Sequence, residues 1–121
     1  STLRQSIATN KVSFFRGSWI ADYPDAENYL SLFYSKNFTP NGPNYTHFKS
    51  IEFDKLYELA LQTVDDEERI KLYEKMDKII AEEIPVIVLF YDKAARFSQQ
   101  NISGLSINPM NILNVKYIKK H

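Results

Sequence analysis

The sequence predicts an α/β fold, in which helices pack against a sheet, and three observations point to it. A continuous apolar run at 86–91 (VIVLFY) has the length and β-branched content of a strand. Because it does not alternate with polar residues, we expect both of its faces to be buried, as in a sheet covered on two sides. A second run at 11–19 (KVSFFRGSW) is rich in Val and Phe and also predicts a strand. The third observation is a pair of amphipathic helices between them.

The helix pair is predicted at 51–64 and from Asp65 to about residue 83. Ser50 is the expected N-cap of the first helix, and Asp65 with Glu68 forms a capping-box pattern at the start of the second. Apolar residues follow the helical period on one face of each segment. The expected buried residues are Phe53, Leu56, Tyr57, Ala60, Leu61 and Val64 in the first helix, and Leu72, Tyr73, Met76, Ile79 and Ile80 in the second.

The remaining elements are shorter. Residues 3–8 read as the end of a helix, and Pro24 forces a turn before a short helix at 26–34 for which Asp25 is the expected N-cap. The stretch 38–48 collects Pro, Gly and Asn and predicts a loop. Pro85 ends the helix pair, and short strands are expected at 96–98 and 114–118.

Composition excludes several classes of function. Lys and Arg number 15, as do Asp and Glu, so no overall charge attracts nucleic acid or an anionic membrane. The absence of cysteine excludes disulfide scaffolds, thiolate catalysis and cysteine-ligated zinc. No apolar run approaches the ~18 to 20 residues of a membrane span. No cofactor is expected.

Enzyme sites are also disfavoured. The two histidines, His47 and His121, show no metal-ligand spacing, and the three glycines are too scattered for a phosphate-binding loop. Asp22 and Asp25 suggest a carboxylate pair of the kind that hydrolyses glycosides. If Asp25 caps a helix, however, only one carboxylate remains, and a lone carboxylate beside aromatic residues favours binding over catalysis.

The candidate binding residues are Arg16, Trp19 and Asp22, at the end of the first predicted strand. Strand ends are where ligands dock in α/β sheets. Trp19 offers an apolar wall and an indole donor, and Asp22 offers an acceptor for a cationic group. Arg16 could hold Asp22 or receive a ligand carboxylate. A structural ion pair beneath a packed Trp19 is the alternative.

The run GSWIADYPDAEN at 17–28 resembles a signature of the dipeptide and oligopeptide solute-binding proteins of ABC importers (family 5 type). The resemblance continues in order through nearly the whole chain. It takes in 44–46 (NYT), 53–56 (FDKL), 65–69 (DDEER), 72–73 (LY), 85–87 (PVI), 90–91 (FY) and 115–121 (VKYIKKH).

The resemblance implies the C-terminal part of a two-lobed, type II periplasmic-binding-protein-like fold, with the helix pair packed on a mixed sheet. Residues 1–90 would belong to the second ligand-binding lobe, and 91–121 to the hinge crossing and the return towards the first lobe. Most of the first lobe would lie outside this chain. From about Phe90 onward, we therefore expect the chain to pair with another copy or to be poorly ordered.

The resemblance also implies a site and a function. Asp22 would pair with the α-ammonium of a bound peptide, Trp19 with its neighbours Ser18 and Ile20 would line the cleft, and Arg16 would lie near side-chain pockets. Tyr91 would reach the ligand from the interlobe crossing. The chain would then be the substrate-binding component of an importer, not an enzyme, and no metal is expected.

Its partners would be a peptide, the membrane permease subunits and the N-terminal lobe, with no nucleic acid. It would be periplasmic or on the cell surface, lipid-anchored through a region that precedes this chain. Two alternatives remain: a ligand-sensing regulatory module on the same fold, and a carboxylate-dependent hydrolase using Asp22 and Asp25.

Overall fold

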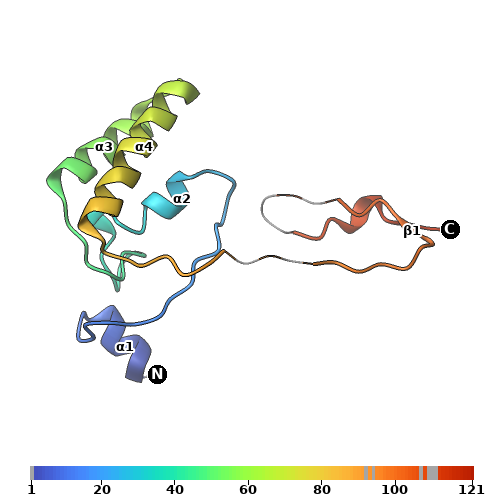
Figure 1. Ribbon diagram of the computed structural model, residues 1–121, viewed down its shortest axis with the longest axis horizontal. Helices are drawn as coiled ribbons and strands as arrows, with labels where there is room; N and C mark the ends of the chain where they lie inside the picture. The colour runs from blue at the N-terminus through green and yellow to red at the C-terminus, as the bar shows by residue number, and fades with distance from the viewer. Residues whose placement is uncertain (1, 92, 94, 107, 109–111) are drawn as a thin grey trace.

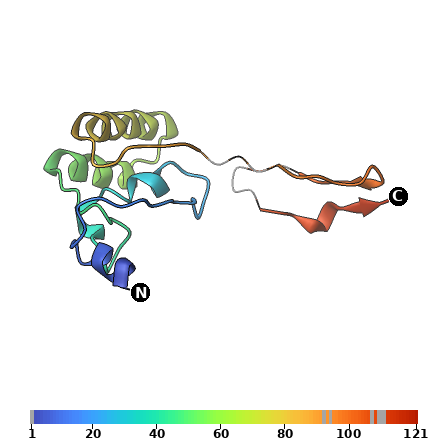
Figure 2. The same cartoon turned by 60° about the horizontal axis from the view of Figure 1, so that its bottom comes forward.

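The computed structural model describes residues 2–91, 93, 95–106, 108 and 112–121. The helices gather in one body, and the C-terminal residues form a hairpin that extends away from it (Figures 1 and 2). The α-helices are α1 (Thr2–Ala8), α2 (Glu27–Leu30), α3 (Ile51–Gln62) and α4 (Asp66–Glu83). Two 3-10 helices, η1 (Ser35–Asn37) and η2 (Val115–Tyr117), and two strands, β1 (Ile102–Ser103) and β2 (Lys119–Lys120), complete the described elements.

The predicted helix pair is confirmed, and so are both of its N-caps. The Ser50 hydroxyl accepts the backbone N–H of Phe53 at 3.3 Å, and the Asp65 carboxylate accepts that of Glu68 at 2.9 Å. Helix α4 ends at Glu83 because Ile84 takes a left-handed conformation, φ 49°, directly before Pro85. The two helices lie side by side along their length (Figure 2).

Removing the cap of α4 should measurably weaken the body. Asp65→Ala leaves the Glu68 N–H without its side-chain acceptor, and we expect it to lower the free energy of unfolding by about 1 kcal/mol. Urea unfolding followed by circular dichroism measures this change. Asp65→Asn keeps a capping oxygen and is the matched control, so an equal loss in both variants would mean that the cap contributes nothing.

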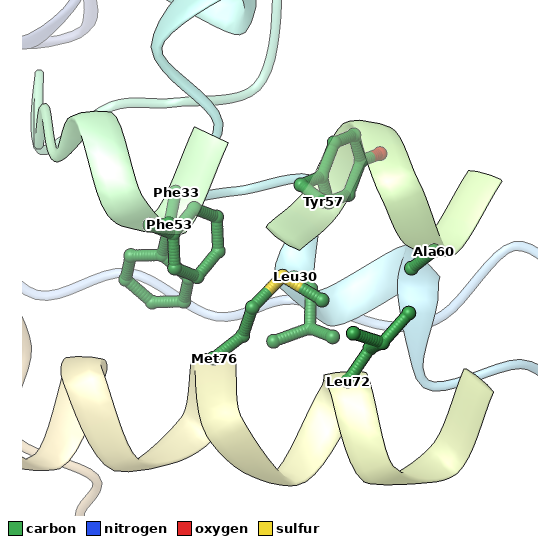
Figure 3. Close-up of a cluster of buried hydrophobic side chains, with 7 residues drawn as sticks. All are labelled: Leu30, Phe33, Phe53, Tyr57, Ala60, Leu72 and Met76. Atoms are coloured by element: carbon green, nitrogen blue, oxygen red, sulfur yellow. The ribbon is translucent and has the colours of Figure 1, made fainter. Parts of the chain in front are cut away.

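The core is a small cluster contributed by three parts of the body (Figure 3). Its buried side chains are Leu30 and Phe33 from the α2 region, Phe53, Tyr57 and Ala60 from α3, and Leu72 and Met76 from α4. Phe53 lies at its centre, fully buried, with the rings of Phe33 and Phe48 edge-on at 6.3 and 5.8 Å between centroids. Two residues expected in this core are exposed instead, Leu61 by 60% and Val64 by 92%. Helix α3 ends before Val64, and Leu61 lies beside the face that α4 covers.

The loop at 38–48 is confirmed and is organised by one buried amide. Asn44 is fully buried and donates from Nδ2 to the carbonyls of Tyr34 (3.1 Å) and Phe48 (3.0 Å). In the same loop, the hydroxyl of Thr39 donates to the carbonyl of Ala8 at the end of α1, at 3.0 Å. These bonds attach α1 and the loop to the helical body.

The two long predicted strands are wrong for this chain. Residues 11–19 and 86–91 form no regular element, and Ile87 to Tyr91 are 63 to 84% exposed. A strand buried on both faces needs neighbouring strands and covering layers. The described residues offer 86–91 neither of these, because their one sheet is the small C-terminal pair. The predicted mixed sheet beneath the helices is therefore not formed by the described part of the chain.

The C-terminal hairpin also differs from expectation. Strands β1 and β2 pair antiparallel, with Ile102 opposite Lys120 and Ser103 opposite Lys119, whereas strands were expected at 96–98 and 114–118. Gly104 permits the close approach, because its φ is +82° and an added Cβ would lie 1.8 Å from the Tyr117 carbonyl oxygen. Pairing with another copy, which the sequence also suggested for this region, stays a prediction.

The accessible surface of the chain is large for its mass. It measures 9883 Å², against about 6,800 Å² for a compact monomer of this size. The apolar side chains from Ile87 to Tyr91 are 63 to 84% exposed, whereas Phe53 and Met76 in the body are fully buried. Within the described residues, no helix has the length and apolar character needed to cross a membrane.

Candidate functional site

The candidate site is the segment 16–22, which leads into α2. It has no regular secondary structure, and its side chains are exposed except for those of Trp19 and Ala21, which are half-buried. Ser18 is exposed, and Ile20 projects into solvent with 78% of its surface accessible. A segment of this kind can reach a ligand, but something else must hold it in place.

A single buried amide holds it. The Oδ1 atom of Asn28 accepts the indole N–H of Trp19 at 2.7 Å and the backbone N–H of Asp22 at 3.3 Å. Asn28 lies in α2 and is only 3% exposed. Of the predicted site residues, the structure therefore brings together Trp19 and Asp22, through a third residue that they share.

The carboxylate of Asp22 is exposed and makes no hydrogen bond or ion pair with any described residue. The structural ion pair with Arg16, left open by the sequence, is thus not formed. The guanidinium of Arg16 instead lies over the ring of Phe90, 6.0 Å from its centroid.

The remaining predicted site residue, Tyr91, is not gathered into this arrangement. It is 84% exposed, and no polar or ring contact among the described residues joins it to Trp19 or Asp22. Its neighbour Phe90 is the point at which the segment after the helix pair meets the segment 16–22.

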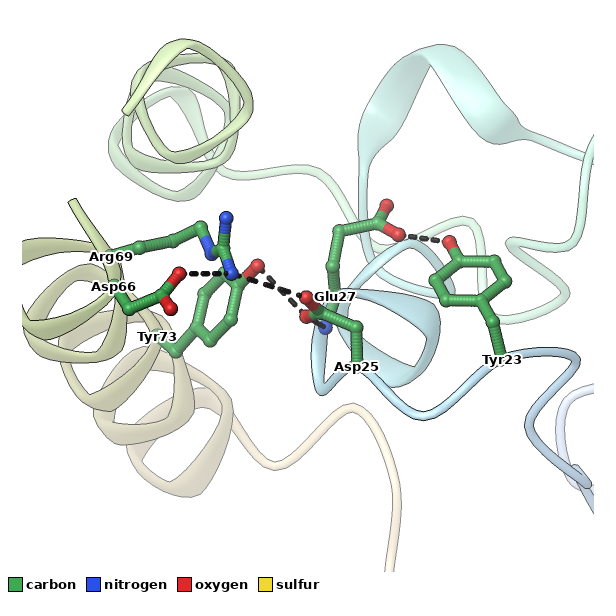
Figure 4. A network of polar contacts seen from close by, with 6 residues as sticks. All are labelled: Tyr23, Asp25, Glu27, Asp66, Arg69 and Tyr73. Atoms are coloured by element: carbon green, nitrogen blue, oxygen red, sulfur yellow. Dashed lines mark hydrogen bonds and ion pairs between the residues drawn. The ribbon is translucent and has the colours of Figure 1, made fainter. Parts of the chain in front are cut away.

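Asp25, the other half of the suspected carboxylate pair, is committed to structure (Figure 4). It accepts the backbone N–H of Glu27 at 2.9 Å and the hydroxyl of Tyr73 at 2.9 Å, and Arg69 approaches it at 3.5 Å. Asp25 was expected to be the N-cap of a helix at 26–34. Helix α2 instead spans 27–30 with Ala26 as its N-cap residue, and Asp25 accepts the Glu27 N–H from one residue before that cap. Because Asp25 is occupied, the two carboxylates do not form a hydrolytic pair.

Arg69 and Glu27 extend this network into a polar bridge between α2 and the helix pair. Arg69 also pairs with Asp66 at 2.8 Å, and Glu27 accepts the hydroxyls of Tyr23 and Tyr57. Burial and the bond to Glu27 raise the pKa of Tyr57, and burial and the bond to Asp25 raise the pKa of Tyr73 to about 12. These bonds fix α2, and with it Asn28, against α3 and α4.

This bridge predicts a loss of stability at alkaline pH. The folded-state pKa of Tyr73 lies near 12 and its ordinary value is 10.0, so folding favours the protonated phenol. Its contribution is complete below pH 10 and is lost as pH rises towards 12. We expect the free energy of unfolding to fall across this window, and to fall less steeply in Tyr73→Phe. Urea titrations across the window measure the slopes. Tyr29→Phe, at an exposed tyrosine in α2, should keep the parent slope, and a Tyr73→Phe slope equal to the parent's would contradict the prediction.

No metal centre is indicated within the part of the chain that the structure describes, where no group of three His, Cys, Asp or Glu side chains is placed to share an ion. Residues 16–22 offer the carboxylate of Asp22, which has no partner among the described residues, the oriented indole of Trp19 and the guanidinium of Arg16.

None of the known protein-family models matches the chain. Among curated proteins, it is 30% identical to the periplasmic oligopeptide-binding protein OppA of Salmonella typhimurium over 109 residues, 88% of this chain and 19% of that protein. It is 32% identical to the glutathione-binding protein GsiB of Salmonella choleraesuis over 81% of the chain and 19% of the relative. Di/tripeptide-binding protein 4 of Pseudomonas aeruginosa is 31% identical, over 77% of the chain and 17% of the relative.

The chain belongs to the dipeptide- and oligopeptide-binding protein family. It spans about a fifth of the length of the curated relatives it matches. The three relatives reported above are binding proteins by name, and none of them is named as an enzyme.

For this member of the peptide-binding family, reasoning from the sequence missed Asn28 as a site residue. The signal was present, because Asn28 is the last residue of the signature at 17–28. Its role depends on the fold of the segment, which brings the indole of Trp19 and the backbone N–H of Asp22 to the side-chain oxygen of Asn28. Residue types and spacing do not predict that return.

Proposed function

We propose that this chain is part of the substrate-binding component of an ABC importer, and that Asp22 binds the α-ammonium of a captured peptide. The periplasmic location named for the oligopeptide-binding relative supports the same location for this protein. We further propose that the whole protein is anchored to the membrane by a lipid, in the periplasm or on the cell surface. Its partners would be the peptide and the permease subunits in the membrane.

The observation that carries this proposal is the state of Asp22. Its carboxylate is exposed and has no partner among the described residues, while its backbone N–H and the neighbouring indole of Trp19 are held by buried Asn28. An acceptor on a fixed segment suits an ammonium ligand, because the pairing energy is not reduced by a competing internal ion pair. The ligands named for the three relatives reported above, oligopeptides, di- and tripeptides and glutathione, all carry an amino group, whereas the deoxycholate named for a further relative does not.

We also propose that residues 1–90 are part of the second lobe and that 91–121 cross the hinge towards a first lobe of the same protein. Support comes from the exposed run at 86–91, since an apolar stretch of this length is expected to be covered in the intact protein. The relatives are about five times as long as this chain, which leaves room for such a lobe. Closure of two lobes would desolvate Asp22 and its ligand together.

Mass spectrometry of the ligand that co-purifies with the full-length protein tests the function directly. We expect peptides with free amino termini from the parent protein. Their recovery should fall in Asp22→Ala and should be unchanged in the matched control Glu52→Ala, which removes an exposed carboxylate on α3. A non-peptide ligand, or equal peptide recovery from Asp22→Ala, would contradict the proposal.

A further inference from the structure

We infer that Asn28 is a positioning residue of the binding site: its side-chain oxygen sets both the direction of the Asp22 carboxylate and the plane of the Trp19 indole. The inference rests on the proposed function, since it concerns how the peptide anchor is held. It assigns to one buried amide a role in ligand affinity although that amide itself lies beneath the binding surface.

The geometry favours a shared acceptor. A single oxygen, Oδ1 of Asn28, receives donors from Trp19 at 2.7 Å and Asp22 at 3.3 Å, which closes the intervening chain into a loop. Because Asn28 as a residue is only 3% exposed, its side-chain oxygen is shielded from water that would otherwise compete for both donors. Losing it would leave the two donors without this acceptor, which costs more than losing the same bonds in solvent.

Asn28 is itself fixed by its own backbone and by its helix. Its N–H donates to the carbonyl of Asp25 at 3.2 Å, and it lies within the helical residues of α2. The polar bridge described above then ties α2 to α4 through Asp25. The oxygen that receives Trp19 and Asp22 is therefore part of the rigid body, although the segment it holds is exposed.

The consequence is preorganisation of the peptide anchor. Residues 16–22 have no regular secondary structure, so without the Asn28 bonds the Asp22 backbone could rotate and the carboxylate would sample many directions. A ligand would then have to order the segment as it binds, which lowers affinity. With Asn28 in place, that ordering is complete before the peptide arrives.

The test compares three variants of the full-length protein by calorimetry, each with a peptide bearing a free amino terminus and with its N-acetylated form. Asn28→Leu has similar size but no acceptor. Asn28→Asp keeps an acceptor for both donors. Ser31→Ala is the matched control, because it removes the hydrogen bond to the Asn28 carbonyl and leaves Oδ1 untouched. Thermal unfolding of each variant and the emission of Trp19, obtained by subtracting the spectrum of Trp19→Phe, accompany the binding data.

We expect Asn28→Leu to weaken binding of the free peptide by about ten- to a hundredfold, with a loss of less than about threefold for the acetylated peptide. Its Trp19 emission should change, whereas Asn28→Asp should restore the emission and most of the affinity. Ser31→Ala should match the parent in both readouts.

Equal losses for the two peptides in Asn28→Leu would overturn the inference and give Asn28 a purely structural role, as would unchanged affinity. If Asn28→Leu fails to fold, the folded variant Asn28→Asp tests the inference instead. A Trp19 emission or a peptide affinity in Asn28→Asp that differs strongly from the parent's would overturn the inference. If the parent binds no peptide, the proposed function fails and this inference fails with it. If the parent binds peptides and Asn28→Leu binds them equally well, the positioning role of Asn28 is wrong but the proposed function stands.

Discussion

Replacing Asp22 with alanine in the full-length protein should reduce affinity for peptides with a free amino terminus by two to four orders of magnitude. The reason is that the proposed closed state buries the carboxylate with the ligand ammonium, and removing one partner of a buried pair costs about 3 to 5 kcal/mol. In the structure, Asp22 has no competing partner among the described residues, so its full pairing capacity is available to the ligand.

Calorimetry with a matched pair of peptides isolates this effect. N-acetylation removes the ligand charge, so Asp22→Ala should matter far less for the acetylated peptide. The control variant Glu52→Ala, also at an exposed acidic position, should bind both peptides as the parent does. If Asp22→Ala lowers affinity equally for the two peptides, Asp22 supports the structure of the segment and does not recognise the amino terminus.

The largest expected loss of stability comes from Phe53→Ala. Phe53 is fully buried in α3 and its ring meets Phe33, Phe48 and Tyr57, so the truncation leaves a cavity at the centre of a small core (Figure 3). We expect the free energy of unfolding to fall by about 3 to 5 kcal/mol, which is enough to unfold a marginal body outright.

Urea unfolding of the chain, followed by circular dichroism, measures this loss. Leu61→Ala is the matched control in the same helix, because Leu61 is 60% exposed and its truncation opens no cavity. The control should remain within about 0.5 kcal/mol of the parent. Comparable losses in the two variants would show that the buried cluster does not dominate the stability of the helical body.

Local sequence was sufficient for the helix pair. Ser50 and Asp65 cap their helices through side-chain oxygens that accept N–H groups three residues ahead. Buried residues recur at the helical spacing within each helix, as Phe53 and Tyr57 do in α3 and Leu72 and Met76 do in α4. The caps are short-range interactions. The two helices bury part of their apolar faces against each other, and Leu30 and Phe33 complete the cluster. Helical spacing of apolar residues, together with side-chain caps close in sequence, was therefore sufficient to predict this helix pair.

The strands depended on partners that sequence does not supply. The run at 86–91 has the composition of a buried strand, but burial is a property of neighbouring strands and covering layers, and the described residues place none beside it. The same holds for 11–19, which resembles a strand in composition but forms an irregular segment that is only partly buried. A composition that suits a sheet cannot create the sheet.

The candidate site divides in the same way. The sequence by itself determined which chemistry is present: an acceptor at Asp22, an indole at Trp19, and an Asp25 that serves a helix. Only the tertiary structure decided that Asp22 has no partner among the residues it describes, that Arg16 lies over Phe90, and that Asn28 joins Trp19 to Asp22. Side-chain chemistry is a property of single residues, whereas pairing depends on where the backbone returns, and that is set by the packing of α2 against the helix pair.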